Sequence, residues 1–404
     1  MYIARALEAR LGQMAGNFPA VMVCGARQTG KTTMLKHFQE THTEINYISL
    51  DNLFIRQMAK DDPELFLQSY KPPLIIDEFQ YAPDLLSYIK IRVDEAGKNG
   101  MYFLSGSQLF HMMKNVTESM AGRIGIITMY PLSRAEIEGR VSKPFNPDDI
   151  SDVESTADLE DIFQSLSLGG MPALASGRNK SPEDFFESYL NTYLERDVYE
   201  IIRLRNKDKF IAFLRCLAAR TGQELNLNGL GKDVGIDQKT AENWISVLST
   251  TGIIHLVQPF HSNLAKRIIK RPKLYFMDTG LAIHLAGWMP PEVLERSALS
   301  GAFFETYVVS EIIKSYANSG LFPHRRIFYY RDSSRREIDL VIADRGALYP
   351  IEIKKSGTPG KDAVKSFSAL AELGYPVGRG AVVCMTPRTM PLDEKNTLVP
   401  VSAI

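Results

Sequence analysis

Short apolar runs alternate with helical patterns along the first third of the chain. The predicted strands are 19–24, 44–50, 73–76 and 101–104. A glycine closes the first run, and a helical pattern begins at Lys31. Strands that alternate with helices predict a parallel sheet covered on both faces. Pro131 and the polar stretch 142–158 indicate where this first domain ends.

The middle of the chain is helical in pattern. Large apolar residues recur at helical spacing over 182–203. Two short helical patterns follow at 227–234 and 238–250, and the apolar stretches 253–258 and 273–276 come after them. A helix-turn-helix followed by two strands predicts a winged helix.

The region from Pro290 onward predicts a separate α/β unit. A helix over 302–317 comes first, and Asp344-Arg345-Gly346 predicts a hairpin turn between two of the strands that follow. The predicted strands are 326–331, 337–342, 348–354 and 380–385.

Composition narrows the class of protein. The 404 residues are enough for several domains, and 47 basic residues balance 47 acidic ones. Binding to DNA or to acidic lipid would therefore need a local patch. The three cysteines are sparse and form no metal-binding pair, which is typical of a reducing compartment. No leader and no run of about 18 apolar residues is present, so we expect a cytoplasmic protein without a membrane segment.

Residues 25–32, Gly-Ala-Arg-Gln-Thr-Gly-Lys-Thr, match the phosphate-binding pattern GxxxxGK[ST] between a strand and a helix. Lys31 is expected to reach the β- and γ-phosphates of ATP, and the Thr32 hydroxyl to ligate Mg²⁺. The predicted nucleotide-binding residues of the loop are Gly25, Ala26, Arg27, Gln28, Thr29, Gly30, Lys31, Thr32 and Thr33.

A second motif supports a nucleotide site. The apolar run 73–76 ends in Asp77, expected to hold Mg²⁺, and Glu78, expected to polarise the attacking water. Ser107 is the predicted sensor of the γ-phosphate, and a plain turn explains it equally. Arg123 is predicted to complete a nucleotide site in cis or from a neighbouring subunit of a homo-oligomer, with a surface arginine as the alternative.

The winged-helix region carries the candidate DNA contacts. Its second helix presents polar residues on the outer face, and five basic residues without an acid occupy 266–273, between the predicted wing strands. Such a cluster favours contact with DNA phosphates over reading of bases. A solvated linker, or packing against the ATPase, is the alternative. The predicted DNA-binding residues are Lys239, Asn243, Lys266, Arg267 and Lys270.

Four residues of the tail indicate metal-dependent phosphodiester cleavage. Asp339 lies on one predicted strand, Glu352 and Lys354 lie on the next, and Glu305 lies on the preceding helix. Carboxylates would hold Mg²⁺ or Mn²⁺, and the lysine would position or activate the water. The alternatives are strand charges that discourage edge pairing and a nuclease fold kept only for binding.

These ordered motifs resemble a prokaryotic AAA-type ATPase family (AAA_14) with a C-terminal DUF4143 region. The matching segments are GARQTGKTT, PPLIIDEFQY, FLSGSQ, SMAGRIG, MYPLSRAE, YLNTYLERDV and PKLYFMDTGLAIHLAG. The tail is similar to the PD-(D/E)XK nuclease fold, although Ile338 stands where that pattern has proline.

The resemblance implies an α/β fold class: a P-loop AAA-type parallel-sheet ATPase with a helical lid, a winged helix and a restriction-endonuclease-like domain. The expected domains are 1–145, 146–210, 211–288 and 289–404. We expect a protein that binds and hydrolyses ATP and acts on DNA. The alternative is a nucleotide-gated switch or defence-type regulator whose C-terminal domains bind protein partners without cleavage.

Overall fold

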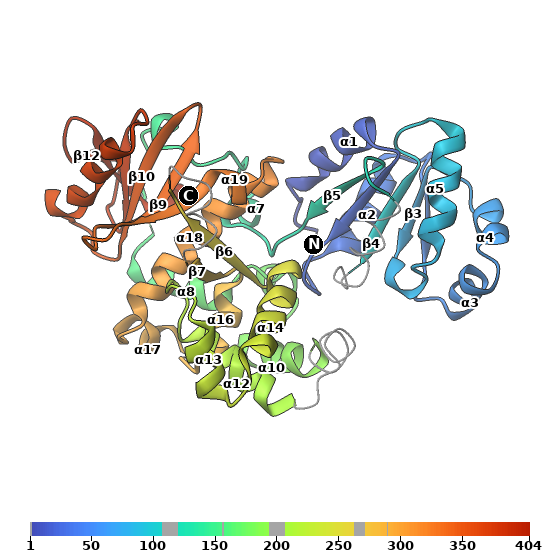
Figure 1. The fold of residues 1–404 in the computed structure, drawn as a ribbon, viewed down its shortest axis with the longest axis horizontal. Helices are drawn as coiled ribbons and strands as arrows, with labels where there is room; N and C mark the ends of the chain where they lie inside the picture. The colour runs from blue at the N-terminus through green and yellow to red at the C-terminus, as the bar shows by residue number, and fades with distance from the viewer. Residues whose placement is uncertain (1, 107–119, 156, 194–206, 262–270, 289) are drawn as a thin grey trace.

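The computed structural model describes residues 2–106, 120–155, 157–193, 207–261, 271–288 and 290–404. The N-terminal sheet stands on one side of the molecule, and the central helices and the C-terminal sheet stand on the other (Figure 1). Among the described helices, none is long and apolar enough to span a membrane.

The N-terminal sheet has five parallel strands in the order β2-β3-β4-β1-β5. They are β1 (Ala20–Cys24), β2 (Asn46–Ser49), β3 (Leu74–Asp77), β4 (Tyr102–Gly106) and β5 (Ile124–Thr128). The predicted parallel sheet is therefore confirmed. The fifth strand was not predicted, because its short Ile-Gly-Ile-Ile-Thr run stands beside a glycine-rich turn and is only half buried.

Helices cover both faces of this sheet, as the apolar pattern predicted. One face packs against α1 (Leu7–Asn17) and α2 (Lys31–Thr41). The other packs against α3 (Leu53–Asp61), α4 (Pro63–Ser69) and α5 (Leu85–Ala96). The sheet is buried on both sides, so its strands are almost continuously apolar.

The central region is helical, and its helix-turn-helix is confirmed: α13 (Leu227–Val234) and α14 (Gln238–Thr250) have the predicted bounds. Asp237 caps α14 by accepting a hydrogen bond from the Thr240 amide. The other helices between the two sheets are α7 (Arg134–Ile137), α8 (Leu159–Leu168), α9 (Pro172–Ala175), α10 (Pro182–Tyr193), α12 (Lys207–Ala218) and α16 (Thr279–Ala286). A 3₁₀ turn, η2 (Pro147–Asp149), lies in the connection to this region.

The C-terminal sheet has eight strands in the order β12-β13-β11-β10-β9-β8-β6-β7. They are β6 (Ile254–Pro259), β7 (Lys273–Phe276), β8 (Ile327–Arg331), β9 (Glu337–Asp344), β10 (Ala347–Lys354), β11 (Gly380–Cys384), β12 (Met390–Pro391) and β13 (Asn396–Pro400). The predicted wing strands β6 and β7 pair with each other in an antiparallel arrangement, and β6 also pairs with β8. The tail is therefore not the separate unit that the sequence predicted.

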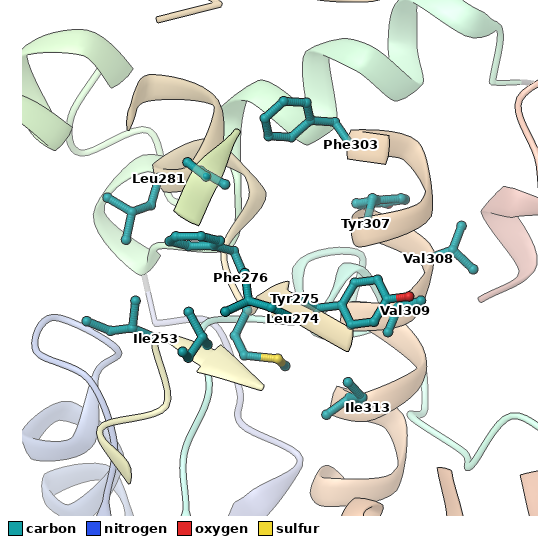
Figure 2. Close-up of a cluster of buried hydrophobic side chains, with 14 of the residues drawn as sticks. Ile253, Leu274, Tyr275, Phe276, Leu281, Phe303, Tyr307, Val308, Val309 and Ile313 are labelled. Carbon is teal, nitrogen blue, oxygen red and sulfur yellow. The ribbon is translucent and has the colours of Figure 1, made fainter. Parts of the chain in front are cut away.

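Helix α18 (Ser300–Asn318) is the centre of the shared core. Tyr275 of β7 points toward this helix, on which Tyr307, Val309 and Ile313 belong to the same buried apolar cluster (Figure 2). The remaining elements of this half are α17 (Pro291–Arg296), α19 (Pro323–Arg326), η4 (Lys361–Leu373) and η5 (Val401–Ala403). Because α18 packs on β7, the tail helix and the wing cannot move independently without exposing apolar surface.

Candidate functional site

The P-loop joins β1 to α2 at the carboxyl edge of the N-terminal sheet. Gly25 has φ +142°, and a Cβ there would lie 2.1 Å from the carbonyl oxygen of Met129. Gly30 has φ +94° and immediately precedes α2. Both positions therefore need glycine. The loop also places the N-terminus of α2, an eleven-residue helix, at the site.

Lys31 is buried in the first turn of α2. Its ammonium donates to the carbonyl oxygens of Gly25, at 3.0 Å, and of Ala26, at 2.8 Å. These acceptors are neutral and belong to the loop itself. Both carbonyls can give way to the oxygens of an anion that enters the loop.

Asp77 and Glu78 follow β3 at the same edge. Asp77 is buried and accepts hydrogen bonds from the hydroxyl groups of Tyr47, at 2.8 Å, and Ser105. Glu78 has φ +55° and accepts from Gln80. Burial raises the pKa of Glu78. The predicted sensor Ser107 lies outside the described residues, and Ser105, on the adjacent strand β4, is the serine that the structure brings to this pair.

A pocket of about 830 Å³ opens over the loop. Residues 27–33 and Glu78 line one side, and Pro172, Arg178 and Tyr189 line the side formed by α9 and α10. The exposed Arg178 was not singled out in the sequence, where only its neighbouring Gly177 marks a turn. The pocket therefore lies between the parallel sheet and the helices that follow it.

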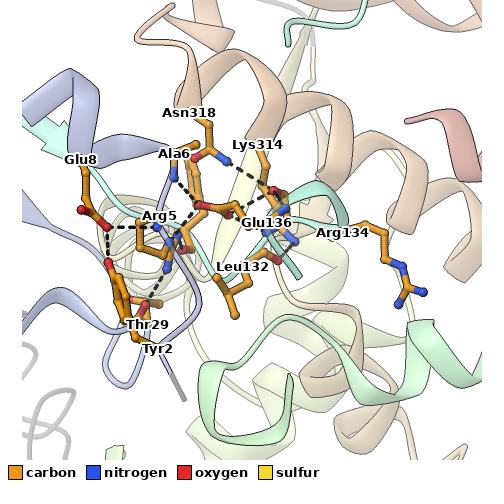
Figure 3. A network of polar contacts seen from close by, with 12 residues as sticks. Tyr2, Arg5, Ala6, Glu8, Thr29, Leu132, Arg134, Glu136, Lys314 and Asn318 are labelled. Carbon is orange, nitrogen blue, oxygen red and sulfur yellow. Dashed lines mark hydrogen bonds and ion pairs between the residues drawn. The ribbon is translucent and has the colours of Figure 1, made fainter. Parts of the chain in front are cut away.

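Arg5 connects the P-loop to the rest of the chain, and sequence analysis missed it. Its guanidinium donates to the carbonyl oxygens of Thr29, at 2.7 Å, and Tyr130, at 2.8 Å, and to the carboxylate of Glu136, at 2.9 Å (Figure 3). Arg5 is only 5% exposed. A single arginine before an apolar helix carries no sequence signal for such a role.

The same polar network reaches α18 (Figure 3). Glu311 accepts from the Arg134 amide at 2.7 Å, and Lys314 donates to the Leu132 carbonyl at 3.2 Å. Lys314 and Glu311 also form a buried ion pair at 2.8 Å. Hydrogen bonds therefore run from the P-loop carbonyl to the helix that carries Glu305.

Arg123 is not brought to the P-loop within one chain. It precedes β5, at the edge of the sheet opposite the loop, and its guanidinium pairs with Asp94. Both side chains are substantially exposed. The placement leaves a role in cis unsupported, and a role in a neighbouring subunit stays a prediction.

The candidate DNA residues divide into two groups. Lys239 and Asn243 are exposed on α14, and Ala241, Trp244, Ile245 and Leu248 are buried on its inner face. Lys266, Arg267 and Lys270 lie outside the described residues. Lys273, at the end of the same basic run, is buried, so it does not belong to an exposed basic wing.

The predicted hairpin between β9 and β10 is confirmed, and it brings three of the tail residues together. Phe328 pairs with Val341 and Tyr330 with Ile338, so Asp339 and Leu340 form a bulge opposite one residue of β8. Asp339 accepts from the amide of Ile353 at 2.8 Å. On β10, Lys354 donates to Glu352 at 2.6 Å.

Glu305 of α18 meets two residues of β7. It accepts from the Tyr275 hydroxyl at 2.6 Å and from the Lys273 ammonium at 3.4 Å. Lys273 also pairs with Glu337 of β9 at 2.7 Å. The sequence position of Lys273 could have indicated that it is buried, because it lies on the same face as Tyr275 in an otherwise apolar strand.

Burial and mutual repulsion change the titration of this cluster. Burial, and then the charge of Asp339, raise the pKa of Glu305 to about 7 and that of Glu352 to about 7. Burial also raises the pKa of Asp339. Burial alone would lower the pKa of Lys273, but the surrounding carboxylates, Glu305 foremost, raise it overall. Lys273 is therefore a permanent cation.

A divalent metal at the tail, which the nuclease resemblance implies, does not fit these contacts. Among the described residues, no three His, Cys, Asp or Glu side chains are arranged to hold a metal ion. The ammonium of Lys273 already lies at hydrogen-bonding distance of Glu305, a predicted metal ligand, and of Glu337. One oxygen, Oε2 of Glu352, is buried with no hydrogen-bond partner in the described structure.

The fold and the loop define a P-loop domain, and sequence comparison assigns this domain to the AAA family. Residues 17–138 match the AAA domain family (AAA_14), 159–292 match a domain of unknown function (DUF8612), and 300–404 match another (DUF4143). The chain therefore carries an AAA domain followed by a DUF8612 and a DUF4143 region.

Among its relatives are uncharacterized proteins of Mycobacterium tuberculosis and Mycobacterium bovis. Each is 27% identical over 402 residues, covering 99% of this chain and 84% of the relative. A Walker-type ATPase of Pyrococcus abyssi aligns with 70% of this chain and 96% of its own at 16% identity and a TM-score of 0.45. A RuvB variant of Thermotoga maritima aligns with 62% and 88% at 18% identity and a TM-score of 0.32.

Proposed function

We propose that this protein binds ATP with Mg²⁺ at the P-loop and hydrolyses it. The observation that carries the proposal is that Lys31 and Glu78 line one pocket at the carboxyl ends of β1 and β3. A buried ammonium suits the triphosphate, and a carboxylate beside it suits the attacking water.

The residues divide the work as follows. Lys31 exchanges its carbonyl partners for the β- and γ-phosphate oxygens, while the amides of the loop and the start of α2 hold the phosphates. Thr32 and Asp77 hold the Mg²⁺ that accompanies ATP, and Tyr47 and Ser105 fix the Asp77 carboxylate.

Glu78 takes a proton from the water as that water attacks the γ-phosphorus. The bond from this phosphorus to the bridging oxygen breaks, and ADP and inorganic phosphate leave. The raised pKa of Glu78 makes it a stronger base than an exposed carboxylate.

Phosphate release from ATP tests this mechanism. Glu78→Gln should bind ATP but lose turnover at least about 100-fold, because removing one transition-state group typically costs that much. Lys60→Ala, which removes an exposed cation of α3, is the control. Normal turnover in Glu78→Gln would end this assignment, whereas tight ATP binding without turnover in the unmodified chain would favour the nucleotide-gated switch.

DNA binding is a second candidate function, favoured by the exposed polar face of α14. Lys239 and Asn243 project from the second helix of a helix-turn-helix, where phosphate contacts are expected. Lys239→Ala with Asn243→Ala should weaken binding to every DNA sequence and reduce its salt dependence by roughly one unit of log–log slope. Lys395→Ala, in an exposed turn far along the tail, is the matched control.

DNA-stimulated turnover separates the two classes of function. If the protein acts on DNA, duplex DNA should raise phosphate release, and high salt should abolish the increase. Indifference to DNA at low salt would favour a switch that binds protein partners. DNA cleavage by Asp339, Glu352 and Lys354 stays a prediction of the sequence, and the contacts of Lys273 do not favour it.

A further inference from the structure

The carboxylate cluster of the tail is built across two regions of the chain. Lys273 and Tyr275 come from β7, in the DUF8612 region, and Glu305 comes from α18, in the DUF4143 region. Strand β9 adds Glu337 and Asp339. Lys273, which lies outside the tail, thus contacts acidic residues of the tail.

Only 5% of the side chain of Lys273 is exposed. It lies 2.7 Å from Glu337 and 3.4 Å from Glu305, and 5.6 Å from the centre of the Tyr329 ring. Burying an ammonium is costly unless hydrogen bonds and opposite charge compensate for the lost water.

Positive charge from the protein accompanies each glutamate of the cluster. Lys273 is the cation shared by Glu305 and Glu337, and Arg331, which pairs with Glu224 at 2.9 Å, lies 3.7 Å from the second oxygen of Glu337. Lys354 matches Glu352 at 2.6 Å. Asp339, held by a backbone amide, is the fourth carboxylate.

We infer that the ammonium of Lys273 is the resident cation of this cluster and takes the place that a divalent metal ion has in a metal-dependent nuclease. The ammonium contacts Oε1 of Glu305, one of the three carboxylates predicted to hold the metal, and its charge repels a second cation. The cluster then fastens β7 to α18 and β9 by ion pairs, and it does not bind Mg²⁺ or Mn²⁺.

Direct Mn²⁺ binding by the nucleotide-free full chain tests this inference. Every protein carries Asp77→Asn, so that the P-loop contributes no Mn²⁺ binding, and free Mn²⁺ is followed by electron paramagnetic resonance. We expect no bound Mn²⁺ at millimolar metal in this parent. Adding Lys273→Met should create a site for a single Mn²⁺ and raise the melting temperature when Mn²⁺ is present, since the carboxylates then lack their cation.

Two controls make the result specific. Lys395→Met, at an exposed turn, should gain no Mn²⁺ binding, and Glu305→Gln added to Lys273→Met should remove the gain.

The inference is overturned if the parent binds Mn²⁺ and loses it with Glu352→Gln, which would assign the metal to the unpartnered oxygen of Glu352. It is also overturned if Lys273→Met binds no more Mn²⁺ than Lys395→Met. The parent measurement needs no substitution at Lys273, so it decides the matter even if that variant fails to fold.

Discussion

Two buried lysines, Lys31 in the P-loop and Lys273 in the C-terminal sheet, are almost equally hidden from solvent, at 7% and 4% exposure. Their partners differ in kind. Lys31 donates to neutral carbonyl oxygens, whereas Lys273 pairs with two carboxylates. The two neutral acceptors of Lys31 can give way to an incoming anion, whereas the two charged acceptors of Lys273 balance its ammonium.

We infer that the charge of the partners, rather than the degree of burial, decides what each of these two lysines can do. Carbonyl oxygens can be exchanged for phosphate oxygens at little electrostatic cost, because the phosphate brings the charge that the carbonyls lack. Exchanging carboxylates for a ligand would leave buried anions behind. A ligand site and a structural anchor thus use the same residue type.

Removing Lys273 tests the comparison of the two lysines most strongly. Lys273→Met should lower the free energy of unfolding by about 3–5 kcal/mol, because Glu305 and Glu337 then face each other without their shared cation. Urea unfolding in metal-free buffer measures this loss. A loss below about 1 kcal/mol, the range of surface ion pairs, would show that the pair is solvated and that Lys273 is no anchor.

Removing Lys31 should affect activity and spare stability. Lys31→Met leaves the carbonyls of Gly25 and Ala26 beside an open pocket, where water can replace the ammonium. We expect ATP turnover to fall at least about 100-fold, with the free energy of unfolding changed by less than about 1 kcal/mol. Phosphate release and urea unfolding on the same preparation check both halves. A large stability loss would instead make Lys31 a structural residue like Lys273.

Local motifs predict the candidate nucleotide site, since Lys31, Asp77 and Glu78 stand at fixed offsets from apolar strands whose ends meet in a parallel sheet. The sequence places Lys273 in the basic run of the predicted wing, close to Lys270. Its position on an apolar strand is the weaker local pattern, and it is the one that the fold follows. Its partners Glu305 and Glu337 are far away along the chain, and the pairing of β6 with β8 that unites them leaves no local pattern. Long-range pairing of this kind follows from packing of the whole core.

Arg5 and Glu136 form another buried ion pair. It joins the segment before α1 to α7, at the start of the helical region. Glu136→Gln keeps an oxygen acceptor but removes the charge, so we expect a loss of about 2 kcal/mol in the free energy of unfolding. Arg5 also holds the Thr29 carbonyl, so the KM for ATP should rise. In the double variant with Arg5→Met, the loss of stability should be smaller than the sum of the two single losses. Additive losses would mean that the two side chains act independently.

The smallest effect is expected at the exposed pair of Arg123 and Asp94. Screening by solvent makes such pairs contribute little, so Asp94→Asn should leave the melting temperature almost unchanged. The five residues of β5 separate Arg123 from the edge of the sheet that carries the P-loop, a distance of roughly 15 Å at about 3.3 Å per residue. Arg123→Ala should therefore not change ATP turnover in dilute protein. Turnover per chain that rises with protein concentration, and loses this rise in Arg123→Ala, would show that Arg123 completes the site of a neighbouring subunit. A turnover loss at every concentration would mean that the arginine acts on its own chain, which its pairing with Asp94 at the opposite edge of the sheet argues against.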